Sequence, residues 1–236
     1  MEAIILAGGK AERLGDAAGG GPKALVPIAG HALAEYQVNQ LVRVGVERVL
    51  VSCAAGQGSL FLDTLSHLGA EIVPAEEPEP LGRGGGLRFA AALREGTGPL
   101  YALNGDELLD VDLEAMLERH RDRGAAATIA VAPMTSPLGV VDIDEDDLVM
   151  GFREAPRLPF WVNIGCYVLD DEALERLPER GDHEQTTFPE LAAEGKLLAH
   201  RHEGVWLTVN TPKQLRLAAD YFQAHPELRP SVARRA

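Results

Sequence analysis

The sequence predicts an α/β fold in which a mainly parallel sheet carries helices on both faces. In the first half of the chain, short apolar runs alternate with segments of helical periodicity, and repeated strand–helix units of this kind are typical of parallel sheets. The chain has 236 residues, of which 46% are hydrophobic, so it can bury a sizeable core. We therefore expect a single domain over residues 1–225, followed by a C-terminal tail at 226–236.

The first half is expected to alternate strands and helices in chain order. An apolar run at 3–6 predicts the first strand, and one helical face then gathers Ala34, Val38, Leu41 and Val42. The pattern continues with strands at 48–53, 71–73 and 99–103 and with helices at 60–68 and about 87–93. In sheets of this class ligands bind at the carboxyl ends of the strands, so functional side chains are expected there.

The second half is less regular. Apolar runs predict strands at 128–131, 139–143 and 160–169, which are expected to extend the sheet and to carry a lid or an acceptor region. The last helix is expected to begin at Pro212 with Thr211 as its N-cap, because threonine caps helices well and proline is favoured at the first helical position.

The composition limits the classes of partner. The formal net charge of −14 disfavours nucleic acid, because an acidic surface repels phosphate backbones. The N-terminus is acidic and only briefly apolar, unlike a signal peptide, and no apolar run approaches membrane-spanning length. We therefore expect a cytoplasmic protein without membrane partners. Cys53 and Cys166 lie in apolar runs and are expected to be small core residues.

A glycine-rich loop follows the first predicted strand. Backbone N–H groups at Gly8 and Gly9 can approach phosphate oxygens closely. Arg13 and Lys23, beside this loop, supply the positive charge that a triphosphate needs. The spacing is neither a Walker A loop nor the dinucleotide-binding Gly-x-Gly-x-x-Gly pattern. An ordinary flexible loop is the alternative for the glycine pair alone, and the two basic residues favour phosphate binding.

Four segments, in the right order, resemble the nucleotidyltransferase superfamily, which includes sugar-1-phosphate nucleotidylyltransferases. The run Leu6-Ala7-Gly8-Gly9…Arg13-Leu14…Pro22-Lys23 is similar to the signature loop of that superfamily. Residues 81–87 resemble its base-binding loop, residues 103–106 its metal-binding strand end, and residues 161–168 its sugar-binding strand. The resemblance implies a Rossmann-like α/β/α sandwich. It also implies a nucleotide site made of Leu6, Ala7, Gly8, Gly9, Gly84, Gly85, Asn104 and Gly105.

The run Gly84-Gly85-Gly86 lies just before the helix expected from about residue 87. Three glycines there leave room for a flat base or for phosphates, with a flexible helix start as the alternative.

Asp106 is the predicted metal ligand. It follows the strand at 99–103, and Gly105 beside it permits a close approach. A carboxylate oxygen there suits Mg²⁺, which usually takes one or two carboxylates together with substrate phosphates, and Mn²⁺ can substitute for it. The alternative is a turn aspartate that caps the next segment. The glycine loop upstream favours the metal.

Residues on the acceptor side follow from the resemblance. Asn163 and Gly165 lie in an apolar strand, where a polar amide needs a partner, either a sugar hydroxyl or neighbouring backbone. Gly139 matches a glycine that lies against the sugar in relatives, and Glu154 matches the acidic member of a Glu-Lys pair. These four residues are therefore expected to face the substrate.

The chain departs from the family pattern at two positions. Ala155 stands where relatives have the lysine that holds the acceptor phosphate, and Arg153 and Arg157 are candidate substitutes. Thr208 stands where many relatives have a metal-binding aspartate. We assign the second metal contact to Asn210, whose amide oxygen is a neutral, hard donor, with helix capping as the alternative role.

The expected reaction is a nucleotidyl transfer in which Arg13, Lys23 and Asp106 are catalytic. An acceptor phosphate oxygen attacks the α-phosphorus of a nucleoside triphosphate in line, and pyrophosphate leaves. The acceptor is a small phosphorylated substrate, a sugar 1-phosphate by resemblance, and a homo-oligomer is compatible with the sequence. Two alternatives stay open. One is a cofactor nucleotidyltransferase of the molybdopterin or cobamide type, and the other is a catalytically weak regulator that binds nucleotide sugars.

Overall fold

A seven-stranded mixed sheet forms the centre of the molecule. The computed structural model describes residues 1–9, 14 and 20–230, and its main sheet has the strand order β12-β8-β11-β6-β1-β4-β5. Four of the six neighbouring pairs are parallel, and both antiparallel pairs involve β11. The strands are β1 (Glu2–Leu6), β4 (Arg48–Ala54), β5 (Glu71–Glu77), β6 (Leu100–Asn104), β8 (Ala127–Thr135), β11 (Arg157–Leu169) and β12 (Leu197–Arg201). The prediction of a mainly parallel sheet is confirmed.

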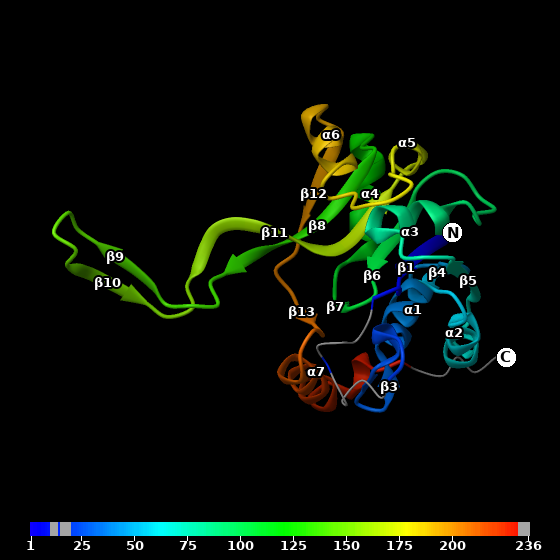
Figure 1. Cartoon of the computed structure of the whole chain (residues 1–236), viewed down its shortest axis with the longest axis horizontal. Coiled ribbons are helices and arrows are strands. Elements are labelled where there is room, and N and C mark those ends of the chain that lie inside the picture. The colour runs from blue at the N-terminus through cyan, green and yellow to red at the C-terminus, as the bar shows by residue number, and fades with distance from the viewer. Residues whose placement is uncertain (10–13, 15–19, 231–236) are drawn as a thin grey trace.

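Helices cover both faces of this sheet (Figure 1). They are α1 (Leu33–Arg43), α2 (Gly58–Leu65), α3 (Gly82–Ala91), α4 (Leu113–Arg123), α5 (Asp171–Glu175), α6 (Thr187–Ala193) and α7 (Pro212–Ala224). None of the helices in the described ranges combines the length and the apolar character needed to cross a membrane.

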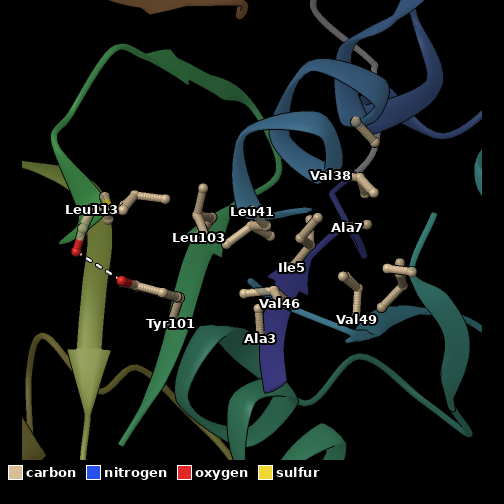
Figure 2. Packing of buried hydrophobic residues seen from close by; sticks show 14 of the residues in the cluster. Ala3, Ile5, Ala7, Val38, Leu41, Val46, Val49, Tyr101, Leu103 and Leu113 are labelled. Atoms are coloured by element: carbon tan, nitrogen blue, oxygen red, sulfur yellow. Dashed lines mark hydrogen bonds between the residues drawn. The ribbon is translucent and has the colours of Figure 1, made fainter. Parts of the chain in front are cut away.

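Successive side chains of β1 enter different buried clusters. Ala3 and Ile5 pack with residues of α1, α2 and α4, whereas Ile4 packs with residues of α3, α5 and α6. Figure 2 shows part of the first cluster, where the Tyr101 hydroxyl also donates a hydrogen bond to the backbone oxygen of Leu113 at 2.7 Å. This alternation is what a strand buried on both faces requires, and it explains the continuous apolar run of the first strand.

A third buried cluster fixes α7 beside the carboxyl edge of the sheet. The Phe222 ring packs on Tyr36 with 4.2 Å between the ring centroids. Thr211 caps the helix by accepting a hydrogen bond from the backbone N–H of Gln214, and Pro212 takes the first position, as predicted. Two short ladders lie nearby: β2 (Pro27–Ile28) with β3 (His31–Ala32), and β7 (Glu107–Leu109) with β13 (Trp206–Thr208).

A two-stranded arm projects from the body (Figure 1). Its strands, β9 (Val140–Ile143) and β10 (Val149–Arg153), form a separate antiparallel sheet. The prediction that residues 139–143 extend the main sheet is therefore wrong. In β9 the side chains of Val141 and Ile143 lie on one face and that of Asp142 on the other, and all three are exposed, so the segment is a strand of a two-stranded ribbon and not a buried strand of the central sheet.

Candidate active site

A cavity of about 1010 Å³ opens at the carboxyl edge of the main sheet. Parallel strands end at the same edge, so the segments that end β1, β4, β5 and β6 line the cavity together. They contribute Leu6, Ala7, Gly8, Gly9, Ala54, Ala55, Glu77, Asn104, Gly105 and Asp106, and Lys23 and Asn210 join them from other parts of the chain. Six of the eight residues predicted to bind the nucleotide therefore lie in one cavity.

Lys23, Asp106 and Asn210 meet inside this cavity. The Lys23 Nζ lies 2.7 Å from Asp106 Oδ2 and also donates to the Asn210 side-chain oxygen. Lys23 begins a short 3₁₀ turn and is only 9% exposed, so these two side chains take the place of most of its hydration. A carboxylate and an amide oxygen thus converge on one cation, and oxygen donors of these kinds suit Mg²⁺. Arg13, the other predicted basic residue, lies outside the described residues.

Asn210 faces the cavity and Thr208 does not. The Thr208 hydroxyl accepts a hydrogen bond from the Gln214 side chain at 2.6 Å and is held within the C-terminal segment. The cap of α7 is Thr211, so Asn210 is not needed in that role. The structure therefore groups Asn210 with Asp106 around Lys23, and the metal contact of Asn210 stays a prediction.

The glycines around the end of β1 differ in their surroundings. A Cβ added at Gly8 would lie 3.4 Å from a carboxylate oxygen of Glu77, whereas one added at Gly9 would meet nothing within 4 Å. Gly105 passes directly over the end of β1: its N–H donates to the Leu6 backbone oxygen at 2.9 Å, and an added Cβ would collide with the same oxygen. Gly105 is therefore required for the close crossing of two strand ends at the cavity floor.

The glycine run assigned to the nucleotide lies inside α3, because this helix begins at Gly82 and not near residue 87. A Cβ at Gly84 would lie 2.7 Å from the backbone nitrogen of His183, and one at Gly85 would lie 2.7 Å from the Glu179 backbone oxygen. The glycines let the helix pack against residues 178–183. The expectation that they precede the helix is wrong, because they lie in its first turns, and the structure does not bring Gly84 or Gly85 to the cavity.

A buried carboxylate in the cavity was not predicted. Glu77 ends β5, is 8% exposed, and accepts hydrogen bonds from the Ser52 hydroxyl at 2.5 Å and from the Leu81 N–H at 3.0 Å. Both donors are neutral, and a carboxylate in such a position gains from further N–H donors. The sequence signal was an acidic residue at the end of a parallel strand, but the predicted strand stopped at residue 73.

The predicted sugar-binding strand finds its partners within the protein. The Asn163 amide donates to Glu184 at 2.8 Å and to the Tyr167 hydroxyl at 3.0 Å, and its oxygen accepts from the Gly165 N–H at 3.0 Å. Gly165 has a φ of +74°, and an added Cβ would lie 2.6 Å from the Asn104 side-chain nitrogen. Neither Asn163 nor Gly165 lines the cavity; Gly165 packs against Asn104, and Asn163 holds the Gly165 N–H.

Arg83 links this strand to the cavity rim. Its guanidinium donates to Asp182 and to Glu184, each at 2.9 Å, and Glu184 also holds Asn163. The two carboxylates neutralise the guanidinium and anchor their own segment over α3. Arg83 therefore fixes the rim more than it offers a free positive charge.

Gly139 and Glu154 lie at the root of the arm and do not line the cavity. An added Cβ at Gly139 would lie 2.5 Å from the Phe152 ring and 3.2 Å from a Glu154 oxygen, so these residues pack against one another. Arg153 and Arg157 are each engaged by a carboxylate, at 2.8 and 3.0 Å. The structure thus leaves Gly139 and Glu154 apart from the nucleotide residues.

Glu107 follows Asp106 and has a different electrostatic environment. Burial, together with the neighbouring Asp106 charge, raises the pKa of Glu107 to about 8, against an opposing hydrogen bond from Trp206 Nε1 at 2.8 Å. Glu107 is therefore largely protonated at neutral pH. It adds a neutral hydrogen-bonding group beside the ion pair of Asp106 and Lys23.

The fold and the cavity define an α/β/α protein with glycines, a lysine, and carboxylate and amide oxygens at the carboxyl edge of its sheet, which is the usual ligand edge of this class. The chain belongs to the Nucleotidyl transferase family, whose sequence pattern matches residues 2–224.

Relatives of known name are similar over most of the chain. Mannose-1-phosphate guanylyltransferase of Mycobacterium tuberculosis (strain ATCC 25618 / H37Rv) is 32% identical over 225 residues, which are 90% of this chain and 62% of that protein. The mannose-1-phosphate guanylyltransferase catalytic subunit beta of Xenopus tropicalis is 31% identical over 242 residues, with 96% and 67% covered. The chain thus spans 62–67% of the length of these two relatives.

Solved structures confirm the fold. The crystal structure of HddC from Yersinia pseudotuberculosis superimposes with a TM-score of 0.74 at 24% identity, covering 94% of this chain and 99% of that one. A second HddC structure, complexed with GMP-PN, gives a TM-score of 0.70 at 23% identity and covers the same shares of the two chains.

Proposed function

We propose that the chain is a Mg²⁺-dependent nucleotidyltransferase that joins a nucleoside triphosphate, preferably GTP, to a sugar 1-phosphate and releases pyrophosphate. The meeting of Lys23, Asp106 and Asn210 in the cavity of the glycine loop carries the proposal, because it combines a phosphate-binding cation with metal-binding oxygens. Family membership and the names of the relatives support the same reaction.

The reaction needs positioning and charge more than acid–base chemistry. A phosphate oxygen of the acceptor forms a bond to the α-phosphorus, the bond from that phosphorus to the bridging oxygen breaks, and pyrophosphate leaves with that oxygen. The attacking oxygen is already an anion, so no strong general base is required. Lys23 would neutralise charge on the phosphates, and Gly8 and Gly9 would let the backbone approach them.

The oxygens of Asp106 and Asn210 fit a divalent ion, because the Lys23 ammonium already shows that both can turn toward one cation. Mg²⁺ bound there would supply positive charge to the triphosphate oxygens. One carboxylate and one amide are few ligands, which agrees with the habit of Mg²⁺ of completing its shell with phosphates and water.

The acceptor proposal rests on the relatives. Their names specify mannose 1-phosphate, which favours a sugar 1-phosphate over a molybdopterin or cobamide precursor. The regulator alternative depended on Ala155 and Thr208. It is disfavoured because Lys23, Asp106 and Asn210 are all gathered in the cavity.

Glu77 is the residue that we assign to base selection. Guanine presents two adjacent N–H donors, N1–H and the 2-amino group, and such a pair matches the two oxygens of a carboxylate. Cytosine and uracil lack this pair. The buried position of Glu77 beside Gly8 makes the match selective, because unpaired polar groups are costly there.

The test is Glu77→Gln with GTP and UTP compared in parallel. The kcat/KM for GTP divided by that for UTP should fall by roughly 10- to 100-fold in the variant, because a hydrogen bond to a charged group contributes about 1.5–3 kcal/mol. Glu79→Gln, at the exposed rim of the same cavity, is the matched control and should leave the ratio unchanged. An unaltered ratio in the Glu77 variant would remove this residue from base selection.

A further inference from the structure

The arm between β8 and β11 is an amphipathic ribbon. Cross-strand pairing gathers four apolar side chains on one face, Val141 with Phe152 and Ile143 with Val149. The opposite face carries Asp142 and Arg153, which form an ion pair at 2.8 Å, together with Gly151 and the half-buried Val140 at the base of the arm. One face of the ribbon is therefore suited to water and the other is not.

The apolar face is open to solvent. Its side chains are 46% (Val141), 62% (Ile143), 55% (Val149) and 66% (Phe152) exposed. In the described part of the chain, thirteen large hydrophobic residues are exposed, and nine of them lie between residues 138 and 161.

The exposed apolar surface of the arm and its base is large. The nine residues, which include the four of the apolar face, together present on the order of 1,000 Å², and each partner of a standard protein interface contributes roughly 800 Å². Monomeric proteins rarely expose apolar patches much above a few hundred Å², and an isolated two-stranded ribbon is only marginally stable in water.

The charges of the arm suit a second copy of itself. Its tip, residues 144–147, consists of four exposed acidic residues. At its base the guanidinium groups of Arg157 and Arg201 lie 5.9 and 5.2 Å from the centroid of the Trp161 ring, and Arg157 also pairs with Glu203. When two arms lie antiparallel, each acidic tip lies beside the arginines of the other chain.

We propose that the arm is a dimerisation element, in which two copies of this chain pair their arms about a two-fold axis, antiparallel and apolar face against apolar face. A two-fold contact buries the same surface on both chains and closes on itself, so it ends at the dimer. The face with Asp142 and Arg153 stays in water. The inference does not depend on the proposed reaction, because association is measured without substrate.

Sedimentation equilibrium over a concentration series tests the proposal. The wild-type chain should have twice its sequence mass at micromolar concentration. Ile143→Lys combined with Val149→Lys should weaken association at least about 100-fold, because it removes apolar burial and brings like charges together. Leu217→Lys, an exposed leucine of α7 that is 53% exposed, is the matched control and should stay dimeric. Melting temperatures of the two variants equal to that of the wild type would exclude misfolding as the cause.

A cross-linking experiment tests the orientation. Asp146→Cys at the tip and Glu203→Cys at the base are purified separately and mixed under mild oxidation, while the native Cys53 and Cys166 are buried. The expected product is a disulfide between the two variants. A disulfide formed mainly between two tips would overturn the antiparallel arrangement. A wild-type chain that stays monomeric would overturn the proposal. This holds even if hydrogen exchange shows that the backbone of the arm is protected, because that protection would then come from the arm's own chain.

Discussion

Lys23 joins two oxygen-bearing side chains of the cavity. Its ammonium contacts Asp106 and Asn210, which lie 83 and 187 positions away in the sequence. Because the side chain is mostly buried, the charge is screened poorly by water and acts strongly on a nearby phosphate.

Lys23→Met tests the role of this charge while keeping the aliphatic stem. Turnover at saturating substrates should fall roughly 10²- to 10³-fold, equivalent to about 2–4 kcal/mol of lost transition-state stabilisation. Lys213→Met, an exposed lysine of α7, is the control and should turn over normally. Wild-type turnover of the Lys23 variant would make this lysine a structural ion-pair partner only.

Asn210→Ala and Thr208→Ala separate the two candidates for the second metal contact. The Mg²⁺ concentration for half-maximal rate should rise several-fold to tenfold in the Asn210 variant, because an oxygen donor is lost. It should stay unchanged in the Thr208 variant, whose hydroxyl is bound to Gln214. If the Asn210 variant keeps its Mg²⁺ requirement and only melts earlier, Asn210 is a structural residue.

Helix α3 shows how tertiary packing sets an element boundary. Glycine disfavours helix, so the sequence predicted a start near residue 87. The helix begins at Gly82 because the chain at 178–183 crosses its first turns and leaves no room for Cβ atoms. Packing against a segment almost a hundred residues away cannot be read from local propensity.

Gly84→Ala should therefore destabilise the protein although alanine favours helix. The added Cβ would lie 2.7 Å from both the His183 nitrogen and a Pro178 carbon, and overpacking of this kind costs about 1–3 kcal/mol. Gly21→Ala is the control, because a Cβ there meets nothing within 4 Å. Urea unfolding measures both. Equal free energies of unfolding for the Gly84 variant and the wild type would show that the segment at 178–183 yields freely.

In the arm, the sequence predicted the element but not the strand with which it pairs. The strand at 139–143 was predicted as a strand and is one, as β9. Its partner was not predictable from alternation, because a strand of the central sheet and a strand of a projecting ribbon both alternate when one face is apolar. The assignment of Gly139 and Glu154 to the substrate depended on which strand residues 139–143 pair with, and it stays a prediction.

At the scale of the whole molecule, the strand–helix pattern predicted for the first half of the chain agrees closely with the structure. The strands at 3–6 and 99–103 are β1 and β6 within one residue at either end, and their carboxyl ends form the cavity where Asp106 was expected. Asn210 and Asp106 both contact Lys23 there, and the metal contact of Asn210 stays a prediction. Glu77 was missed because β5 extends through Pro74 and two acidic residues that read as a strand end.

Pyrophosphate release is the most direct measurement of the proposed reaction. The chain is incubated with each common nucleoside triphosphate against each common sugar 1-phosphate, with Mg²⁺ and with excess chelator. We predict Mg²⁺-dependent release that is greatest with GTP, matches formation of the nucleotide sugar mole for mole, and falls to near background in Lys23→Met. If no pair of substrates releases pyrophosphate while a nucleotide sugar still binds tightly, the proposed enzymatic activity is contradicted and a regulatory role is favoured.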